Sequence, residues 1–306
     1  MTQKILVGYD GSEFAEKALD WAIGEAKALD GELTVVVSTG RPVVADAAIT
    51  GPFLEKIEDE AEQTARRGVQ KAKDAGVRAQ GVLERGDVAG VLVNESRDSS
   101  LVVLGKRGLH GLRGRLGSVS AATAAHAECP VIVLPETIEP TQGDFTGRVV
   151  VAVDKLGLES PSVRKAAEYA QAHGKGLSLV TVIPSVTSLP SGSAELDQAV
   201  SEQLTEPARN MLQEVEDDVV KQFSGLDTSI HILSGRPADA LVQASASADL
   251  VVMGTRGRGG FRGLLMGSTS QAVLHHAACP VMVVPARVAN PDEGFDPTDV
   301  PWRRKR

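Results

Sequence analysis

Two hydrophobic patterns alternate along this chain. Short runs rich in Val, Leu and Ile are separated by longer segments in which apolar residues recur every three or four positions. The first pattern is typical of buried strands and the second of helices that pack one face onto a sheet. The short runs predict strands at 4–7, 33–37, 78–83, 101–104 and 131–134, and again at 148–153, 178–182, 229–233, 250–253 and 281–284.

Helices are expected between these strands. The segment after the first run carries an apolar stripe of helical spacing, with Ser12 as a candidate N-cap, formed by Ala15, Ala18, Leu19, Ala22, Ile23, Ala26 and Leu29. Longer helices are predicted at 53–75 and 194–223, and shorter ones at 88–97 and 237–247. Pro237 suits the first turn of its helix, where its missing N–H is not needed. A further helix is expected to end near Ala277, before the last strand.

The pattern occurs twice because the sequence repeats itself. Gly-Lys-Arg-Gly at 105–108 matches Gly-Thr-Arg-Gly at 254–257, and His-Ala-Glu-Cys-Pro at 126–130 matches His-Ala-Ala-Cys-Pro at 276–280. We therefore expect one domain at 1–136, a polar linker at 137–147, a second domain at 148–286 and a flexible tail at 287–306.

Five strands alternating with four helices predict the fold class. It is α/β, with two tandem doubly wound, Rossmann-like domains, each a five-stranded parallel sheet with helices on both faces. Ligands of such sheets bind beyond the carboxyl ends of the strands, where the strand order reverses. The glycine-rich segments at 105 and 254 each follow a fourth strand, and so lie at such ends.

Composition narrows the function. A formal net charge of −8 leaves no basic field for a polyanionic backbone, so nucleic acid is not expected as a partner. The N-terminus lacks the plan of a signal peptide, and no apolar run approaches the length needed to span a bilayer, so no membrane partner and a cytoplasmic location are expected. The Trp-Arg-Arg-Lys-Arg end is a weak signal for nucleic acid or membrane.

The clearest chemical signal is the segment from Gly254 to Thr269. Its glycines allow backbone N–H groups to approach a ligand closely, and the helix that follows adds a positive dipole at its N-terminus. Both features suit phosphate oxygens. Ser268 and Thr269 add hydroxyl donors, and the arginines at 256, 258 and 262 either add positive charge or point into solvent.

The spacing Gly-two-Gly-nine-Gly-Ser resembles the nucleotide-binding signature of the ATP-binding universal stress proteins. The resemblance covers almost the whole chain twice, in the tandem layout similar to that of actinobacterial members. It implies ATP, with Mg²⁺ as a candidate companion, in a regulatory protein of the stress response. It also implies a homodimer, unidentified regulatory protein partners and pairing of domains through the last strands.

Carried onto this sequence, the resemblance implies an aspartate near the adenosine and a glycine loop on the ribose and phosphates of each domain. The implied nucleotide-binding residues are Asp10, Gly105, Gly108, Gly117, Ser118 and Val119 in the first repeat, and Asp154, Val182, Gly254, Gly257, Gly267, Ser268 and Thr269 in the second. Two departures stand out. The first glycine spacer holds eight residues instead of nine, and Asp154 is followed by a longer segment than the Gly11-Ser12 after Asp10.

Alternative interpretations remain open for each feature. The glycine loops are also typical of tight connections, Asp10 and Asp154 are also typical helix caps, and the whole chain can be read as a nucleotide-free interaction scaffold built on its last strands. His126 and His276 suit structural polar contacts better than a metal site.

The remaining signals concern redox state and catalysis. The two cysteines, at 129 and 279, suit a reduced structural role better than a disulfide. No catalytic motif is present, so we expect a binding protein with slow or no hydrolysis, and not a dedicated enzyme.

Overall fold

The computed structural model describes residues 3–39, 47–109, 115–139, 141–154, 160–185, 194–255 and 266–286, with only the backbone of 47–54 and 194–202. In the first half (residues 3–139) the elements are β1 (Lys4–Gly8), α1 (Glu13–Ala28), β2 (Glu32–Ser38), α2 (Ala47–Asp74), β3 (Arg78–Glu84), α3 (Val88–Glu95), the short 3₁₀ helix η1 (Ser96–Asp98), β4 (Leu101–Gly105), α4 (Ser118–His126) and β5 (Val131–Leu134).

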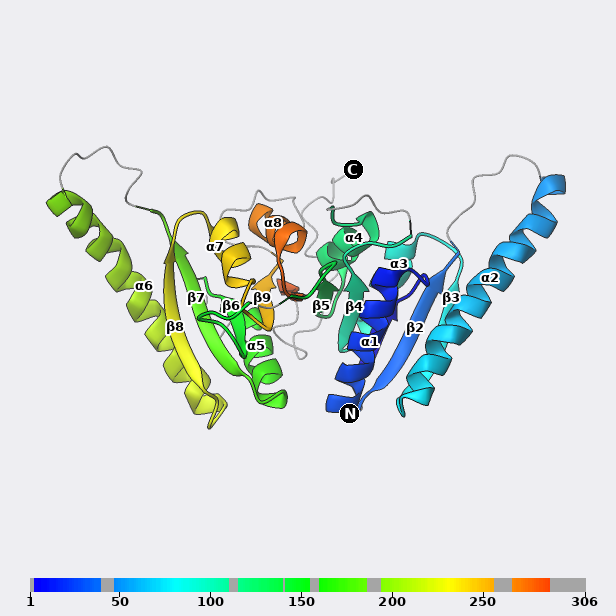
Figure 1. Ribbon diagram of the computed structural model, residues 1–306, viewed down its shortest axis with the longest axis horizontal. Coiled ribbons are helices and arrows are strands. Elements are labelled where there is room, and N and C mark those ends of the chain that lie inside the picture. The colour runs from blue at the N-terminus through cyan, green and yellow to red at the C-terminus, as the bar shows by residue number, and fades with distance from the viewer. Residues whose placement is uncertain are drawn as a thin grey trace, which may run out of the picture.

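The second half (residues 141–286) repeats this order. Its elements are β6 (Arg148–Ala152), α5 (Pro161–Ala172), β7 (Gly176–Ile183), α6 (Ala194–Gln222), β8 (Thr228–Ser234), α7 (Pro237–Ala244), β9 (Leu250–Gly254), α8 (Ser268–His276) and β10 (Val281–Val284). The predicted strands and helices are present, and the two halves spread from the centre of the molecule like two wings (Figure 1).

All ten strands form one sheet in the order β3-β2-β1-β4-β5-β10-β9-β6-β7-β8. Every neighbouring pair is parallel except β5 and β10, which run antiparallel with Ile132 opposite Met282. The expected five-stranded parallel sheets are therefore present, and they join through their last strands within a single chain.

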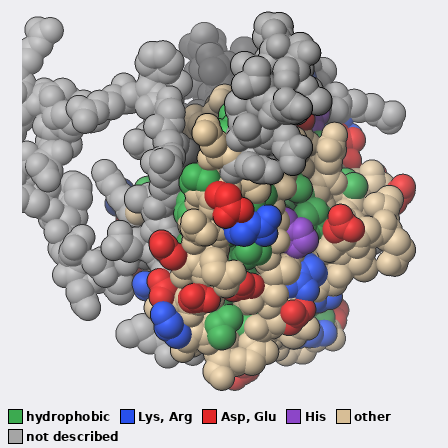
Figure 2. Space-filling view, turned by 90° about the vertical axis from the view of Figure 1, so that its left-hand side faces the viewer, with side chains coloured by type: hydrophobic (Ala, Val, Ile, Leu, Met, Phe, Trp, Pro, Cys, Tyr) green, Lys and Arg blue, Asp and Glu red, His purple; other side chains and the backbone are tan. Residues whose placement is uncertain are grey.

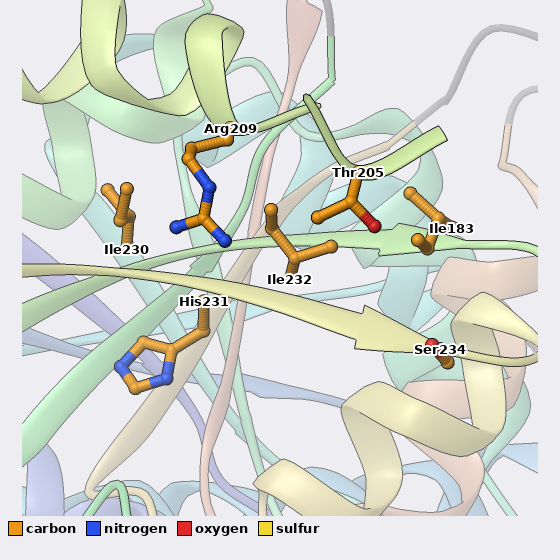
Figure 3. Close-up of a pocket in the computed structure, with 7 residues that line it drawn as sticks. All are labelled: Ile183, Thr205, Arg209, Ile230, His231, Ile232 and Ser234. Carbon is orange, nitrogen blue, oxygen red and sulfur yellow. The ribbon is translucent and has the colours of Figure 1, made fainter. Parts of the chain in front are cut away.

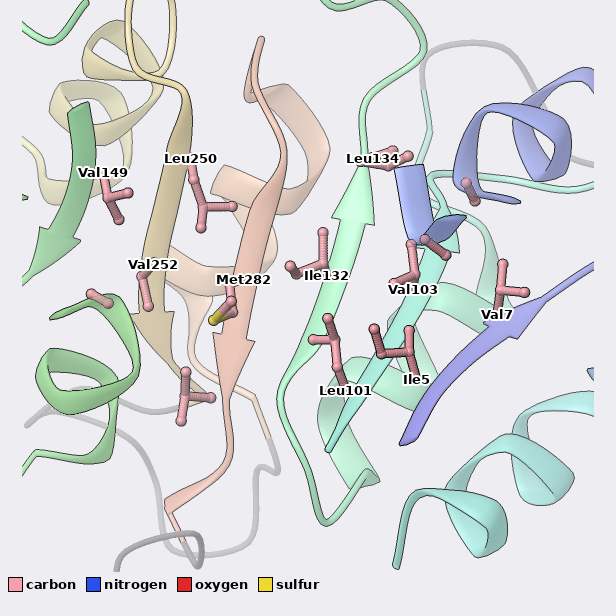
Figure 4. Packing of buried hydrophobic residues seen from close by; sticks show 14 of the residues in the cluster. Ile5, Val7, Leu101, Val103, Ile132, Leu134, Val149, Leu250, Val252 and Met282 are labelled. Atoms are coloured by element: carbon pink, nitrogen blue, oxygen red, sulfur yellow. The ribbon is translucent and has the colours of Figure 1, made fainter. Parts of the chain in front are cut away.

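Helices cover both faces of this sheet. The helices α1, α2, α5 and α6 bury their apolar residues on one face, and α3, α4, α7 and α8 bury theirs on the other. Figure 4 shows the core on the face covered by α1, α2, α5 and α6. It continues across the centre of the sheet, from Ile5 and Val103 through Ile132 to Met282 and Leu250. Because side chains of a strand alternate between faces, the central strands are apolar along most of their length, whereas the edge strands β3 and β8 carry more polar residues.

Local chemistry sets the helix ends. Ser12 caps α1 as expected, since its hydroxyl accepts a hydrogen bond from the Ala15 N–H at 3.2 Å, and Pro237 occupies the first turn of α7. The helices predicted at 88–97 and 237–247 stop earlier, at Glu95 and Ala244.

Equivalent serines explain both early ends. The Ser96 and Ser245 hydroxyls each donate at 2.6 Å to the carbonyl three residues back, on Val93 and Val242. Such bonds compete with the helical pattern of the backbone.

The polar segment after β5 packs against the second half. The Thr141 N–H donates to the Ala246 carbonyl at 2.9 Å, and the buried Phe145 ring meets the His231 ring edge-on with centroids 4.9 Å apart. Among the described residues, no helix is both long and apolar enough to cross a membrane. The tail at 287–306 lies outside the described residues.

Candidate functional site

The strand order reverses once in each half, and the candidate residues lie at those two places. The chain leaves β1 for β2 on one side, while β4 pairs with β1 on the other; β6, β7 and β9 are arranged in the same way. Asp10 follows β1 beside the end of β4 at Gly105, and Asp154 follows β6 beside the end of β9 at Gly254. In doubly wound sheets these crevices are where ligands bind.

The glycine-rich segments after β4 and β9, called loop 1 (residues 105–117) and loop 2 (residues 254–267), close in the same way. In loop 1 the Gly117 N–H donates to the Lys106 carbonyl at 2.8 Å, and in loop 2 the Gly267 N–H donates to the Thr255 carbonyl at 2.8 Å. A serine hydroxyl completes each closure, from Ser120 to the Gly105 carbonyl at 2.7 Å and from Ser270 to the Gly254 carbonyl at 3.0 Å.

The missing residue of the first spacer therefore leaves the two ends of the loop unchanged. Residues 110–114 and 256–265, including Gly257 and the arginines at 256, 258 and 262, lie outside the described residues.

Each loop leads straight into a helix whose N-cap is glycine. Gly117 precedes α4 and Gly267 precedes α8, both in extended backbone conformation. Glycine has no side chain to accept from the N–H groups of the first turn, whereas Ser12 and Asp87 do so for α1 and α3. These first turns present N–H groups and a positive dipole at the crevice, next to the exposed Ser118 and Ser268.

Asp10 ties the turn after β1 to loop 1. Its Oδ1 accepts from the Ser12 N–H at 3.0 Å, and its Oδ2 accepts from the Leu109 N–H at 2.9 Å. The cap of α1 is Ser12, so Asp10 supports the crevice from within. A methyl group at Gly108 would collide with Asp10 Oδ2, so packing within the protein already favours glycine at this position.

Packing also favours glycine at two other positions of loop 1. A Cβ at Gly105 would lie 2.7 Å from the Phe14 carbonyl oxygen, and one at Gly117 would lie 3.2 Å from Arg107 Cα. The glycine pattern of loop 1 is therefore explained by close approach of the protein to itself. This packing does not involve the N–H groups at the N-termini of α4 and α8, so these groups are the part of the crevice that a ligand can use.

Arg107 turns inward from loop 1. Its guanidinium stacks over the Phe14 ring, 4.2 Å from the centroid, and Nη2 lies 3.2 Å from Glu136 Oε2. Its side chain is 8% exposed. This arginine anchors the loop to α1 and to the end of β5.

The remaining predicted residues lie around the same crevices. Val119 and Thr269 are half-buried in the first turns of α4 and α8, and Asp154 is half-buried just after β6. Val182 is half-buried near the end of β7, opposite Leu233 of β8.

Loop 1 is also held by a residue that the sequence interpretation missed. His275, in the last turn of α8, belongs to the other half of the chain. Its Nδ1 lies 3.2 Å from the Leu116 N–H nitrogen, and its carbonyl oxygen accepts from Lys106 Nζ at 2.6 Å. The sequence did contain a signal for this residue, because the two repeats differ here: Ala125 stands at the equivalent position of α4.

His126 and the two cysteines have structural surroundings. His126 Nδ1 lies 2.8 Å from the Ala122 carbonyl oxygen. Cys129 and Cys279 are buried and unpaired, and burial raises the pKa of each thiol to about 12. Among the described residues there is no group of three or more His, Cys, Asp and Glu that could hold a metal ion.

A separate hollow of about 310 Å³ lies at the outer edge of the second half. Figure 3 shows Arg209 of α6 above β8, while the His231 ring points to the opposite side of the strand. Acidic, basic and apolar side chains are intermixed on this side of the molecule (Figure 2). The hollow is lined by Ile183, Thr205, Arg209, Ile230, His231, Ile232 and Ser234, and none of these is a loop residue.

Comparison with known proteins gives one consistent result. Residues 1–135 and 146–285 each match the model of the universal stress protein family. The chain is 31% identical to the universal stress protein Rv1996 of Mycobacterium tuberculosis, over 91% of this chain and 94% of that protein. It is 32% identical to Rv2005c of the same organism, over 91% and 96%.

A solved structure agrees in fold. The crystal structure of a universal stress protein from Archaeoglobus fulgidus aligns with a TM-score of 0.62 at 23% identity, over 92% of this chain and 96% of that one.

Proposed function

Because the chain belongs to the universal stress protein family, we propose that it binds ATP at the loops after β4 and β9 and serves as a regulatory protein in a stress response. The observation that carries this proposal is the duplicated crevice. In both halves a closed glycine loop delivers an uncapped helix N-terminus to the point where the strand order reverses.

The residues of the crevice suit the parts of a nucleotide. The first-turn N–H groups and the hydroxyls of Ser118 and Ser268 are donors for phosphate oxygens, and Thr269 adds a hydroxyl in the second half. Asp10 and Asp154, across the crevice, are assigned to the adenosine side, with Val182 as apolar contact. Mg²⁺ would be brought by the phosphates themselves, since their oxygens are ligands that it prefers.

We propose binding without rapid turnover. No described side chain at either crevice forms the nucleophile and base pair that covalent catalysis requires. Regulation would then follow from occupancy, through contacts with protein partners in the cytoplasm.

Nucleotide extraction tests the binding proposal directly. The purified chain is denatured and the supernatant is assayed for adenine nucleotide, and protein stripped of nucleotide is titrated with ATP by calorimetry. Released nucleotide or saturable binding is expected. Neither released nucleotide nor a binding isotherm would refute the proposal.

Gly267→Val sharpens this test. The extended conformation of Gly267 (φ −73°) accommodates valine, whose side chain would cover the N-terminus of α8. Binding at the second site should be lost. The circular dichroism spectrum and melting temperature of the variant must show that the fold is kept, because a Cβ at the equivalent Gly117 would lie 3.2 Å from Arg107 Cα. Gly24→Val, placed on a face of α1 with open space around it, is the control for a general effect of the substitution.

A nucleotide-free interaction scaffold is the second candidate. The observation that favours it is the packing of Gly105, Gly108 and Gly117, which explains the glycines of loop 1 without a ligand. Ligands that bind the native state raise its melting temperature. A rise with ATP at millimolar concentration would reject the scaffold, and no rise would favour it.

We further propose that whole chains form a homodimer through a surface other than β5 and β10. Each of these strands is already paired on both edges, to β4 and β10 and to β9 and β5. Light scattering after gel filtration tests this, and a monomeric mass would refute it.

A further inference from the structure

The end of α8 and both ends of loop 1 meet across the boundary between the two halves. His275 receives the Leu116 N–H on its ring and the Lys106 ammonium on its backbone carbonyl. We propose that α8 of the second half is a structural part of the first half's nucleotide site, with His275 as the positioning residue that holds Lys106 and Leu116, at the two ends of loop 1, in place. This rests on the function proposed above.

The Lys106 contact satisfies both partners. Lys106 is 8% exposed, so its ammonium needs an acceptor inside the protein. The last carbonyls of a helix lack partners within the helix and carry its negative dipole. The His275 carbonyl belongs to that last turn, so the ammonium ties the start of loop 1 to the end of α8.

The ring contact depends on a neutral imidazole. Only an unprotonated Nδ1 can accept from the Leu116 N–H. Burial lowers the pKa of His275, and the charges on His276, Lys106 and Arg115 lower it further. The acceptor is therefore available at neutral pH and is lost on acidification.

The repeat shows that this link belongs to the first site. Alanine stands at 125 where α8 has His275, and threonine stands at 255 where loop 1 has Lys106. Alanine has no ring acceptor and threonine has no ammonium, so the mirrored contact cannot form by the same groups. In this proposal the first site depends on the second half of the chain, and the same groups provide no matching link for the second site.

Three variants of the full chain test the proposal. His275→Ala installs the residue found at the equivalent place on α4, so the fold is expected to survive. His275→Asn keeps an acceptor atom at the position of Nδ1 but does not titrate. His276→Ala, the exposed neighbour, is the control.

The first measurement needs no nucleotide. Hydrogen exchange of the Leu116 amide should accelerate in His275→Ala by roughly threefold to tenfold, the range expected for one hydrogen bond, and remain protected in His275→Asn and His276→Ala. As the pH falls below about 6.5, the wild-type protection factor should fall while that of His275→Asn stays constant, because the pKa of His275 is lowered from its ordinary value. Unchanged exchange in His275→Ala would overturn the proposal.

The second measurement uses ATP on the Gly267→Val background, where only the first site is open. His275→Ala should weaken binding roughly threefold to tenfold, and His275→Asn should restore it. Equal affinity in all variants would overturn the role in binding. If the wild type binds no ATP at all, the proposed function fails and the role in binding with it, while the exchange data still decide whether His275 positions loop 1.

Discussion

The hydroxyl of Tyr169 donates to Glu25 Oε1 at 3.1 Å, although the two residues occupy equivalent positions in the two halves. Each lies four residues before its helix C-cap, Leu29 for α1 and His173 for α5. The same carboxylate oxygen lies 3.0 Å from His173 Nε2. If two copies of one half paired in the same way, Glu25 would meet Glu25. The contact therefore favours pairing of unlike halves within one chain.

Removal of the Glu25 carboxylate should destabilise the whole protein. Glu25 is 5% exposed, and Glu25→Ala would leave the Tyr169 hydroxyl and the His173 ring without their shared acceptor. We expect a loss of roughly 1–3 kcal/mol in the free energy of unfolding, measured with urea. As a control, Glu13→Ala removes an exposed partner of Lys17 and should change the free energy of unfolding by less than about 0.5 kcal/mol. Equal effects of the two variants would contradict this role.

Stability should also depend on pH through His173. The hydrogen bond with Glu25 raises the pKa of His173, helped by the Tyr169 carbonyl and opposed by burial and Lys175. A raised pKa in the folded state contributes to stability. This contribution is fully present below the unfolded pKa of about 6.5, and it is lost as the pH rises through the folded pKa. The stability difference between wild type and His173→Gln should therefore shrink above pH 6.5. A difference that grows with pH would refute the assignment.

The hydrophobic pattern was sufficient for the strands. The central strands are apolar runs bounded by glycine or polar residues, and the edge strands β3 and β8, although partly polar, keep apolar residues such as Val82 and Ile232. The repeat likewise indicated two similar crevices. Two features could not be read from these patterns. The β5 to β10 pairing of Ile132 with Met282 joins residues far apart in sequence. The His275 contact depends on the relative placement of the halves, which local propensity does not encode.

The packing of loop 1 illustrates a second limit. Glycine at 105, 108 and 117 was interpreted as a cradle for phosphate, but each is also closely packed against a neighbouring backbone or carboxylate. One residue type serves both roles, so the pattern alone cannot separate them.

Two glycines in helices should respond oppositely to alanine. A Cβ at Gly24 of α1 meets open space, so Gly24→Ala should stabilise the protein by about 0.5–1 kcal/mol through helix propensity. A Cβ at Gly68 of α2 would lie 3.0 Å from Val35 Cγ1 and 3.1 Å from Tyr9 Cδ1. Gly68→Ala should therefore lower the melting temperature, and a rise in both variants would show that α2 can move away from β2.

The two thiols should be unreactive until the protein unfolds. Cys129 and Cys279 are 5% and 3% exposed, and their raised pKa values leave almost no thiolate at pH 8. A disulfide-exchange reagent should react at a rate limited by opening of the native state and reach both thiols at once in denaturant. Fast labelling of either cysteine in native protein would show that its strand end opens locally.

Asp10→Asn tests the support of loop 1 from the β1 side. The aspartate accepts two N–H groups, from Ser12 and Leu109, whereas asparagine offers one acceptor oxygen and turns an NH₂ group toward the other donor. We expect a loss of roughly 1–3 kcal/mol in stability and faster exchange of one of these amides. Asp20→Asn, at an exposed partner of Lys71, is the control and should cost less than about 1 kcal/mol. If Asp10→Asn weakened ATP binding while stability and exchange stayed at wild-type values, Asp10 would act on the ligand and not on the loop.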